Sequence, residues 1–158
     1  YKYDSCFAPN CYAFRRGVRA CDAVRRIQSK VRNRRLWAYK VDISNYFNSI
    51  SVPLLLPKLK TLLADDTLLF HFFEQLLNEN RAESEGVIVE EPHGVMAGVP
   101  TAPFLANVYL SDMDFYFWQK GVIYARYSDD IIVFAEDECT LQGYKATIAQ
   151  FLRSYHRH

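Results

Sequence analysis

Two adjacent aspartates, Asp129 and Asp130, stand between two stretches with the composition of buried β-strands, in the sequence ARYSDDIIVFA. Like charges side by side repel each other, and a carboxylate among apolar strands loses hydration that a partner must replace. Two-residue hairpin turns favour Asn-Gly or Asp-Gly, so turn geometry alone does not explain Ser128-Asp129-Asp130. A divalent cation would explain the pair because it cancels the repulsion. The alternative is an exposed turn with two solvated acids.

A third aspartate, Asp42, ends another predicted strand, in KVDISNYFNSI. If the two strands are neighbours in one sheet, Asp42 lies within a few ångströms of Asp129. Acids gathered from separate strands suit magnesium, which prefers oxygen ligands and is held by a few carboxylates plus substrate phosphates. Two such ions ~3.5–4 Å apart support in-line attack at phosphorus. An aspartate at a strand end is common, so Asp42 alone would say little.

The positive charge of the chain is concentrated near its start. Residues 1–40 hold 11 Lys and Arg against two acids, whereas the remainder is acidic. The block is a candidate surface for a polyanion, and the alternative is a solvated helix face. A single acid, Asp22, lies within the block to neutralise it. Its nine basic residues are Arg15, Arg16, Arg19, Arg25, Arg26, Lys30, Arg32, Arg34 and Arg35.

The elements that must position these residues alternate between helix and strand. Apolar residues at three- and four-residue steps predict an amphipathic helix over 17–32 through Val18, Cys21, Val24, Ile27 and Val31. Further along the chain we predict strands at 36–43, 86–90, 122–127 and 131–135, helices at 50–64, 66–80, 101–119 and 141–155, and a loop at 92–103. This order predicts an α+β fold with helices packed on an antiparallel sheet.

Composition sets the outer limits. The 158 residues are 50% hydrophobic, enough for one substantial core. No apolar run approaches the ~20 residues that span a bilayer, and the chain opens without a signal pattern, so a cytoplasmic protein is expected. The four cysteines form no C-x-x-C pair and no zinc-finger spacing, which favours reduced packing residues over a disulfide scaffold.

Four segments, taken together, resemble a known family. KVDISNYFNSI, HGVMAGVPTAPFLANVYLSDMD and YARYSDDIIVFA are similar, in order and spacing, to three successive motifs of reverse transcriptases. The upstream YAFRRGVRACDAV resembles the fingers segment of the bacterial lineage that includes group II intron maturases and retrons. The resemblance covers residues 10–155. It implies a right-hand polymerase palm at 41–158 continuous with a basic fingers segment at 1–40, without the helical thumb, as in a fragment of a longer protein.

The resemblance also implies roles for individual residues. Asp42 and Asp129 match the metal-binding aspartates, with the carbonyl of Ile43 as a further ligand and Asp130 as a supporting catalytic acid. The implied cofactor is a pair of Mg²⁺ ions, with Mn²⁺ as a substitute. Tyr127 is expected under the primer end or in the core. The implied nucleotide-binding residues are Ser44, Asn45, Tyr46, Phe47 and Ala97, and the implied nucleic-acid-binding residues are Arg15, Arg16, Arg19, Arg25, Arg26, Gly98 and Tyr127.

Two positions bear on the substrate. Phe47 matches the bulky gate that excludes a ribose 2′-hydroxyl, because an aromatic ring against the sugar leaves no room for the extra oxygen; the alternative is a core aromatic. Phe47 therefore favours deoxynucleotides and disfavours an RNA-directed RNA polymerase. The glutamine that the family places near the nucleotide and template is Ala97 here. That replacement puts ordinary cDNA synthesis in question, while the metal-binding acids are intact.

The resulting hypothesis is an RNA-directed DNA polymerase, a nucleotidyltransferase whose partners are an RNA template, a DNA or RNA primer and deoxynucleoside triphosphates, with no membrane. The alternative is a polymerase-fold module that binds nucleic acid with little or no turnover. The biological setting stays open among intron mobility, diversity generation, retron synthesis and phage defence, as does the oligomeric state.

Overall fold

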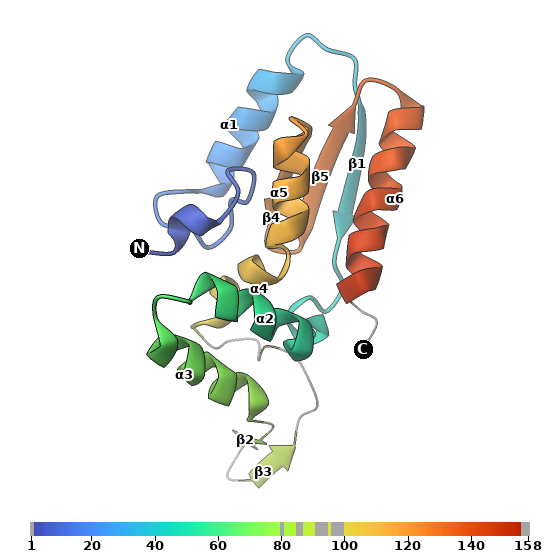
Figure 1. Cartoon of the computed structure of the whole chain (residues 1–158). Coiled ribbons are helices and arrows are strands. Elements are labelled where there is room, and N and C mark those ends of the chain that lie inside the picture. The colour runs from blue at the N-terminus through green and yellow to red at the C-terminus, as the bar shows by residue number, and fades with distance from the viewer. Residues whose placement is uncertain (1, 80, 85–86, 91–94, 96–99, 156–158) are drawn as a thin grey trace.

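The computed structural model describes residues 2–79, 81–84, 87–90, 95 and 100–155, and Figure 1 shows the arrangement of their elements. A three-stranded antiparallel sheet is the centre of the larger part. Its strand order is β1 (Trp37–Asp42), β5 (Asp130–Ala135), β4 (Ile123–Tyr127). β4 and β5 form a hairpin in which Tyr127 pairs with Asp130, so its turn has two residues. The predicted hairpin and the predicted antiparallel sheet are both confirmed.

Helices cover the two faces of this sheet differently. Side chains alternate between the faces along each strand. On one face, Ile131 and Val133 are buried in the main core with residues of α5 (Ser111–Gln119) and α6 (Glu138–Tyr155), such as Phe117 and Ile148. On the other face, a smaller cluster joins Ala125 and Ile132 to α1 (Ala20–Val31). The predicted α+β architecture is therefore observed, with two helices on the core face and one on the opposite face.

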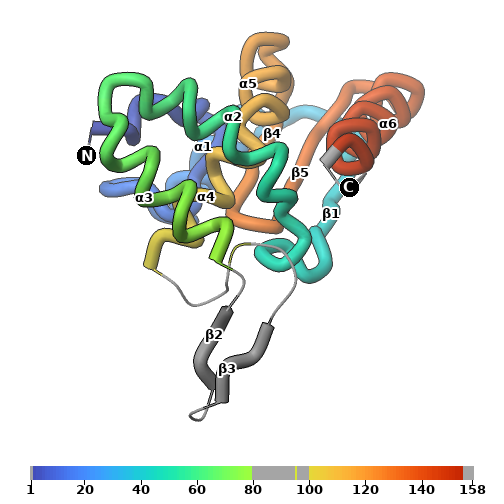
Figure 2. The backbone as a smooth tube through the Cα atoms, turned by 60° about the horizontal axis from the view of Figure 1, so that its bottom comes forward, coloured from blue at the N-terminus to red at the C-terminus, as the bar shows by residue number. Residues whose placement is uncertain are grey.

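The remaining helices form a second layer at the end of the sheet where β1 stops (Figures 1 and 2). They are α2 (Val52–Leu62), α3 (Thr67–Asn78) and α4 (Ala102–Tyr109), and their leucines and aromatics extend the main core. Asp66 caps α3 by accepting the amide of Leu69 at 3.1 Å. Short 3-10 turns lie at Asp4–Cys6 (η1) and Phe47–Ser49 (η2), and β2 (Arg81–Ser84) pairs with β3 (Val87–Glu90).

The structure differs from the predicted elements in three places. The single helix expected over 101–119 is two helices that meet at Leu110, where the Ser111 hydroxyl donates to the Val108 carbonyl at 2.8 Å and competes with the helical ladder. Strand β2 was not predicted. The predicted apolar face of α1 is only partly buried, because Val24 and Cys21 are exposed and Ala23 is the buried residue. Most of the predicted loop over 92–103 lies outside the described residues.

Two smaller expectations concern the cysteines and membranes. All four cysteines are free, and burial raises the pKa of the Cys11 thiol to about 12, which fits packing and keeps the thiol protonated. Within the described part of the chain, no helix combines the length and the apolar character needed to cross a bilayer.

Candidate functional site

Acidic residues meet at the end of the sheet that carries the β4–β5 turn. Asp42 is the direct partner of Asp130 across β1 and β5, and Tyr127 is the direct partner of Asp130 across β4 and β5. Directly opposed residues point to the same face, so these three side chains form a row across the sheet, which we call the acidic row. All three are exposed, and they share the face that α1 covers further along. Two carboxylates and an aromatic ring are thus available to a ligand.

Asp129 joins this row through the turn. Ser128, the first turn residue, has φ +59°, a left-handed conformation that type II′ hairpins usually give to glycine. Asp129 follows it, half-buried, and its carbonyl accepts the Ile43 amide at 3.3 Å. Asp129 therefore lies beside the C-terminal end of β1, as the sequence predicted. Asp130 is nevertheless the residue directly opposite Asp42 in the register.

Lys40 is the nearest counter-charge described for the row. It lies two residues before Asp42 on the same face of β1, and its Nζ is 2.8 Å from Asp130 Oδ1. The hydrogen bond to Asp130 raises the pKa of Lys40, and the charge of Asp42 adds to the effect. Lys40 thus compensates part of the repulsion between two carboxylates that oppose each other across the ladder.

The donor set suits a hard cation. Carboxylate oxygens with a nearby backbone carbonyl are the ligands that magnesium takes in proteins. Among the residues that the structure describes, no three His, Cys, Asp or Glu side chains are close enough together to hold a metal ion as they stand. Asp42 and Asp130 are exposed and directly opposed, however, so one ligand can reach both carboxylates if Asp130 exchanges its ion pair with Lys40 for that ligand. The residues present therefore fit Mg²⁺ in chemistry and in backbone placement.

The segment after β1 carries the predicted nucleotide-binding residues. Ser44 and Asn45 are exposed, and Asn45 has φ +52° at the turn. Phe47 is half-buried against the main core, and its carbonyl accepts the Val95 amide at 3.0 Å. Tyr46 is buried and its hydroxyl donates to the Ala106 carbonyl at 2.6 Å, so its side chain supports the turn from within the core. Ala97 and Gly98 lie outside the described residues.

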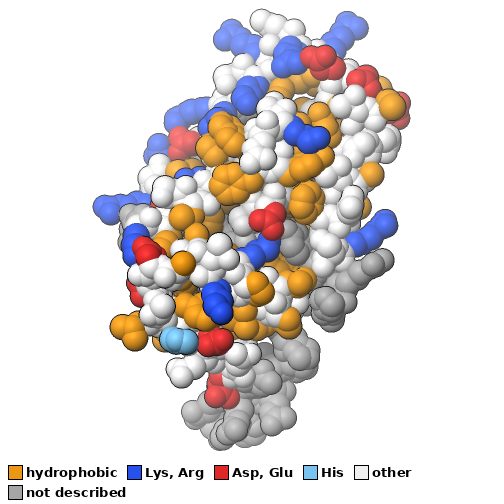
Figure 3. Space-filling model, in the orientation of Figure 1, with side chains coloured by type: hydrophobic (Ala, Val, Ile, Leu, Met, Phe, Trp, Pro, Cys, Tyr) orange, Lys and Arg blue, Asp and Glu red, His pale blue; other side chains and the backbone are white. Residues whose placement is uncertain are grey.

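The predicted basic residues divide into three groups: one that points inward, three that are exposed, and one, Arg26, that packs on an aromatic ring. Arg15 is inward: its guanidinium donates to Asp4 and to the carbonyls of Ala8 and Cys11 at 3.0–3.3 Å, and these bonds use all its N–H directions. Arg16, Arg19 and Arg25 are exposed, and Arg19 and Arg25 share Asp22. Basic side chains gather along the α1 side of the molecule (Figure 3).

Arg26 stands apart from the other arginines of α1. It is half-buried, and its guanidinium lies 5.0 Å from the centre of the Trp118 ring. This cation–π contact joins α1 to the end of α5 and leaves Arg26 less open to solvent than Arg25.

Comparison with protein-family models shows the family of the chain. Residues 2–157 match the family model "Reverse transcriptase (RNA-dependent DNA polymerase)", which is nearly the whole chain. The chain belongs to the reverse transcriptase family. Among curated proteins, none matches the chain with significance.

Solved structures show the same fold for this reverse transcriptase chain. Apo telomerase from Candida tropicalis, truncated from its C-terminal domain, superposes with TM-score 0.72 at 14% identity over 93% of this chain and 34% of that one. Telomerase from Candida albicans in complex with a fragment of telomeric RNA gives TM-score 0.74 at 12% identity over 99% of this chain and 31% of that one. The chain thus spans about a third of the length of these telomerases.

One buried ion pair of this chain was missed from the sequence. Beneath the acidic row, Arg126 of β4 and Asp114 of α5 form a fully buried ion pair, with Nη2 2.6 Å from Oδ2. Burial alone would lower the pKa of Arg126, but the Asp114 carboxylate raises it, so the guanidinium stays charged. The signal in the sequence was a single arginine within an otherwise apolar strand, IYARY.

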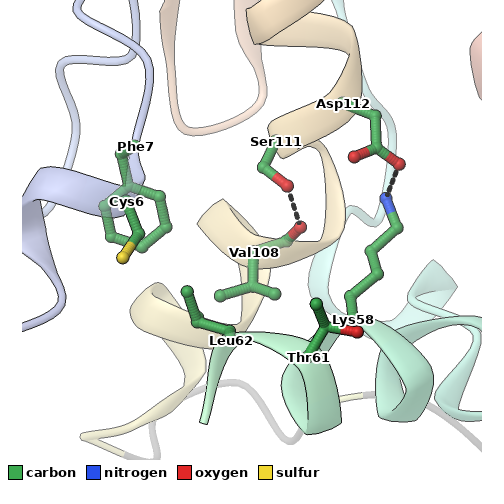
Figure 4. Close-up of a pocket in the computed structure, with 8 residues that line it drawn as sticks. All are labelled: Cys6, Phe7, Lys58, Thr61, Leu62, Val108, Ser111 and Asp112. Atoms are coloured by element: carbon green, nitrogen blue, oxygen red, sulfur yellow. Dashed lines mark hydrogen bonds and ion pairs between the residues drawn. The ribbon is translucent and has the colours of Figure 1, made fainter. Parts of the chain in front are cut away.

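A separate pocket of about 290 Å³ lies between the N-terminal segment, α2 and the α4–α5 junction (Figure 4). Phe7, Leu62 and Val108 give it apolar walls, and Lys58 pairs with Asp112 at 2.7 Å on one side. None of the predicted site residues lines this pocket. It is therefore distinct from the acidic row.

Proposed function

We propose that this chain is the fingers–palm core of an RNA-directed DNA polymerase, which adds deoxynucleotides to a primer 3′-hydroxyl. The observation that carries the proposal is the opposition of Asp42 and Asp130 at the exposed end of the sheet, with Asp129 in the adjoining turn. Membership of the reverse transcriptase family supports the same reaction class.

In this proposal, Asp42 and Asp129 hold two Mg²⁺ ions, with the Ile43 carbonyl as a further ligand and Asp130 as the supporting acid. When bound, the ions supply charge neutralisation at the triphosphate and acidify the primer hydroxyl. The protein's own part is to present the carboxylates from adjoining strands. Lys40 limits their repulsion, and the exposed ring of Tyr127 provides a surface beside them for the primer end.

Phe47 is the proposed sugar gate. It follows Asp42 by five residues and is fixed at η2 by the Val95 amide and by contact with the Tyr46 ring, whose centroid is 5.5 Å away. The ring itself is held by packing against the core and against Tyr46, which limits its room to move aside for a 2′-hydroxyl. Deoxynucleotides are therefore the proposed substrates.

The exposed arginines in α1 and just before it are the proposed nucleic-acid contacts. α1 runs alongside the sheet with its first turn toward the end that carries the acids (Figure 1). Contacts from Arg16, Arg19 and Arg25 to phosphates would be independent of sequence and sensitive to salt. An RNA template is the proposed partner, supported by the telomerase solved with telomeric RNA. Arg15 is left out because its donors are taken.

The proposed lineage is that of bacterial group II intron maturases and retrons, on the strength of the motif YAFRRGVRACDAV. The telomerase structures, at 12–14% identity, show the fold and do not choose between lineages.

A second candidate is a nucleic-acid-binding module without turnover. Its support is that no three metal-binding side chains converge among the described residues and that the Asp130 carboxylate forms an ion pair with Lys40. Magnesium titration separates the two candidates. A polymerase should bind deoxynucleotides in a metal-dependent way through the acids, and a pure binder should not.

The direct test is primer extension by the full-length protein carrying Asp42→Asn or Asp129→Asn. Each change keeps the side-chain shape and removes the charge, so we expect at least a 100-fold loss of incorporation. Asp65→Asn is the control, because Asp65 is an exposed carboxylate paired with Lys2 far from the sheet. Wild-type rates in Asp42→Asn would overturn the proposal.

A further inference from the structure

The turn that carries Asp129 is held from below by a buried side chain. Arg126 Nη1 donates to the Ser128 carbonyl at 3.0 Å. That carbonyl belongs to the peptide between Ser128 and Asp129, so its direction sets the position of the Asp129 backbone. Ser128 is itself in the left-handed region at φ +59°, which costs a non-glycine residue energy and persists only where surroundings impose it. Arg126 is one such surrounding group.

The guanidinium of Arg126 is fully occupied while it makes this contact. Nε and Nη2 bond to the Asp114 carboxylate at 2.6–3.1 Å, and Nη1 also reaches Asn107 Oδ1 at 3.2 Å. Asp114 in turn accepts the Tyr124 hydroxyl at 2.8 Å. Its carboxylate therefore fixes the plane of the guanidinium, and α5, which lies over β4 in Figure 1, fixes the carboxylate.

The same residues fasten the N-terminal segment to β4. The Arg126 amide donates to the Asn10 carbonyl at 3.0 Å, and the Arg126 carbonyl accepts the Tyr12 amide at 2.9 Å. Two buried amide side chains add to this: Asn10 donates to the Asp114 carbonyl and Asn107 donates to the Ala13 carbonyl, at 2.9 and 2.8 Å. The segment that leads into the basic helix is thus joined to the turn through one arginine.

A buried ion pair is a weak means of stabilisation, since apolar residues of similar volume often serve a fold equally well. We infer that Arg126 and Asp114 are positioning residues. They hold the Ser128–Asp129 peptide in the orientation that metal binding needs, and they fix the position of residues 10–13 along β4. This inference rests on the proposed polymerase function for its kinetic consequence, but its structural consequence can be measured without metal or nucleotide.

The test uses the full-length protein with Arg126→Lys. Lysine keeps the charge beside Asp114, but one ammonium group cannot serve Asp114, Asn107 and the Ser128 carbonyl together. Without metal, we expect amide hydrogen exchange to rise at least tenfold at Ile43 and at Tyr12, whose amides bond to the Asp129 and Arg126 carbonyls. With metal, we expect kcat to fall about 100-fold while KM for the deoxynucleotide changes little.

Tyr124→Phe is the matched control, because it removes a hydrogen bond to Asp114 and leaves the Ser128 contact in place. It should lower Tm and leave kcat and exchange at Ile43 near wild type. If Arg126→Lys does not fold, Arg126→Met with Asp114→Leu replaces the pair by apolar volume and is measured in the same way. Unchanged exchange at Ile43 in the folded variant would overturn the inference. If wild type does not polymerise while exchange rises as expected, the proposed function fails and the positioning role stands.

Discussion

Asp42 and Asp130 are direct partners across the β1–β5 ladder, and Lys40, two residues from Asp42 on the same face, forms an ion pair with Asp130 at 2.8 Å. Opposed carboxylates destabilise a ladder unless a cation compensates them. Lys40 therefore neutralises, in the metal-free protein, part of the repulsion that a bound divalent ion would neutralise in the metal-loaded protein.

Removing Lys40 should make the protein depend more on magnesium. With Lys40→Gln, the carboxylates lose their near counter-charge, so a bound divalent ion relieves more repulsion than in wild type. We expect Mg²⁺ to raise Tm by a few °C more in Lys40→Gln than in wild type. Thermal melts with and without Mg²⁺ measure this. Lys60→Gln, on the exposed side of α2, is the control, and equal magnesium shifts in all three proteins would contradict the interpretation.

Shortening Phe47 should weaken sugar discrimination. Phe47→Val opens space beside the sugar, and pocket changes of this size alter selectivity by about 10- to 200-fold. We expect the ratio of ribonucleotide to deoxynucleotide incorporation, compared as kcat/KM, to rise within that range. Phe70→Val is the matched control, since Phe70 is also half-buried against the main core but lies on α3. A ratio that stays at the wild-type value would assign Phe47 to packing alone.

Neutralising the first half of α1 should reduce the salt dependence of nucleic-acid binding. Each lost phosphate contact lowers the slope of log K against log salt by about 0.9 on a duplex. For Arg19→Gln with Arg25→Gln, we expect a decrease of about 2 in a fluorescence titration at several salt concentrations. Arg34→Gln is the control, because Arg34 follows α1 and pairs with Glu136. An equal decrease in the control would indicate a general charge effect rather than a defined surface.

The start of α6 should lose stability in acid. Asp137 accepts the Thr140 amide at 2.8 Å and the Thr140 hydroxyl at 2.7 Å, and these bonds lower its pKa below the ordinary 3.8. A carboxyl with a lowered folded pKa contributes stability above its unfolded pKa and loses it as pH falls through the folded pKa. Asp137→Ala should therefore have a lower Tm than wild type at neutral pH. Melts over a pH series should show the difference shrink as pH falls below 3.8 and vanish once pH is below the folded pKa; a difference constant over pH would contradict the assignment.

The sequence predicted the acid-bearing end of the sheet better than the residues that support it. The strand that ends at Asp42 and the two strands that flank Asp129 were predicted from composition, and the hairpin followed from two short apolar runs around a turn. The register was not visible, because local pattern does not determine which residues of separate strands oppose each other. The opposition of Asp42 to Asp130 therefore needed the structure.

The inward roles of charged residues were also beyond sequence reasoning. Arg15 belongs to a dense basic block, and its partners Asp4 and the Ala8 carbonyl are polar groups that any exposed segment would show. Arg126 and Asp114 are 12 residues apart and become partners only because α5 packs on β4. Counting charges treats all arginines alike, whereas packing decides which ones face solvent.

The β-bridge between Cys11 and Arg126 has a consequence for folding and for self-association of this chain. β4 is an edge of the sheet, and the backbone amide and carbonyl of Arg126 on that edge bond to residues 10 and 12, more than 100 residues earlier in the sequence. Uncovered edges pair with other chains. A chain that began after Ala13 would leave this edge open and invite self-association, and closure of such a distant contact is a slow step in folding. The N-terminal segment thus covers the β4 edge of the palm sheet and prevents it from pairing with another chain.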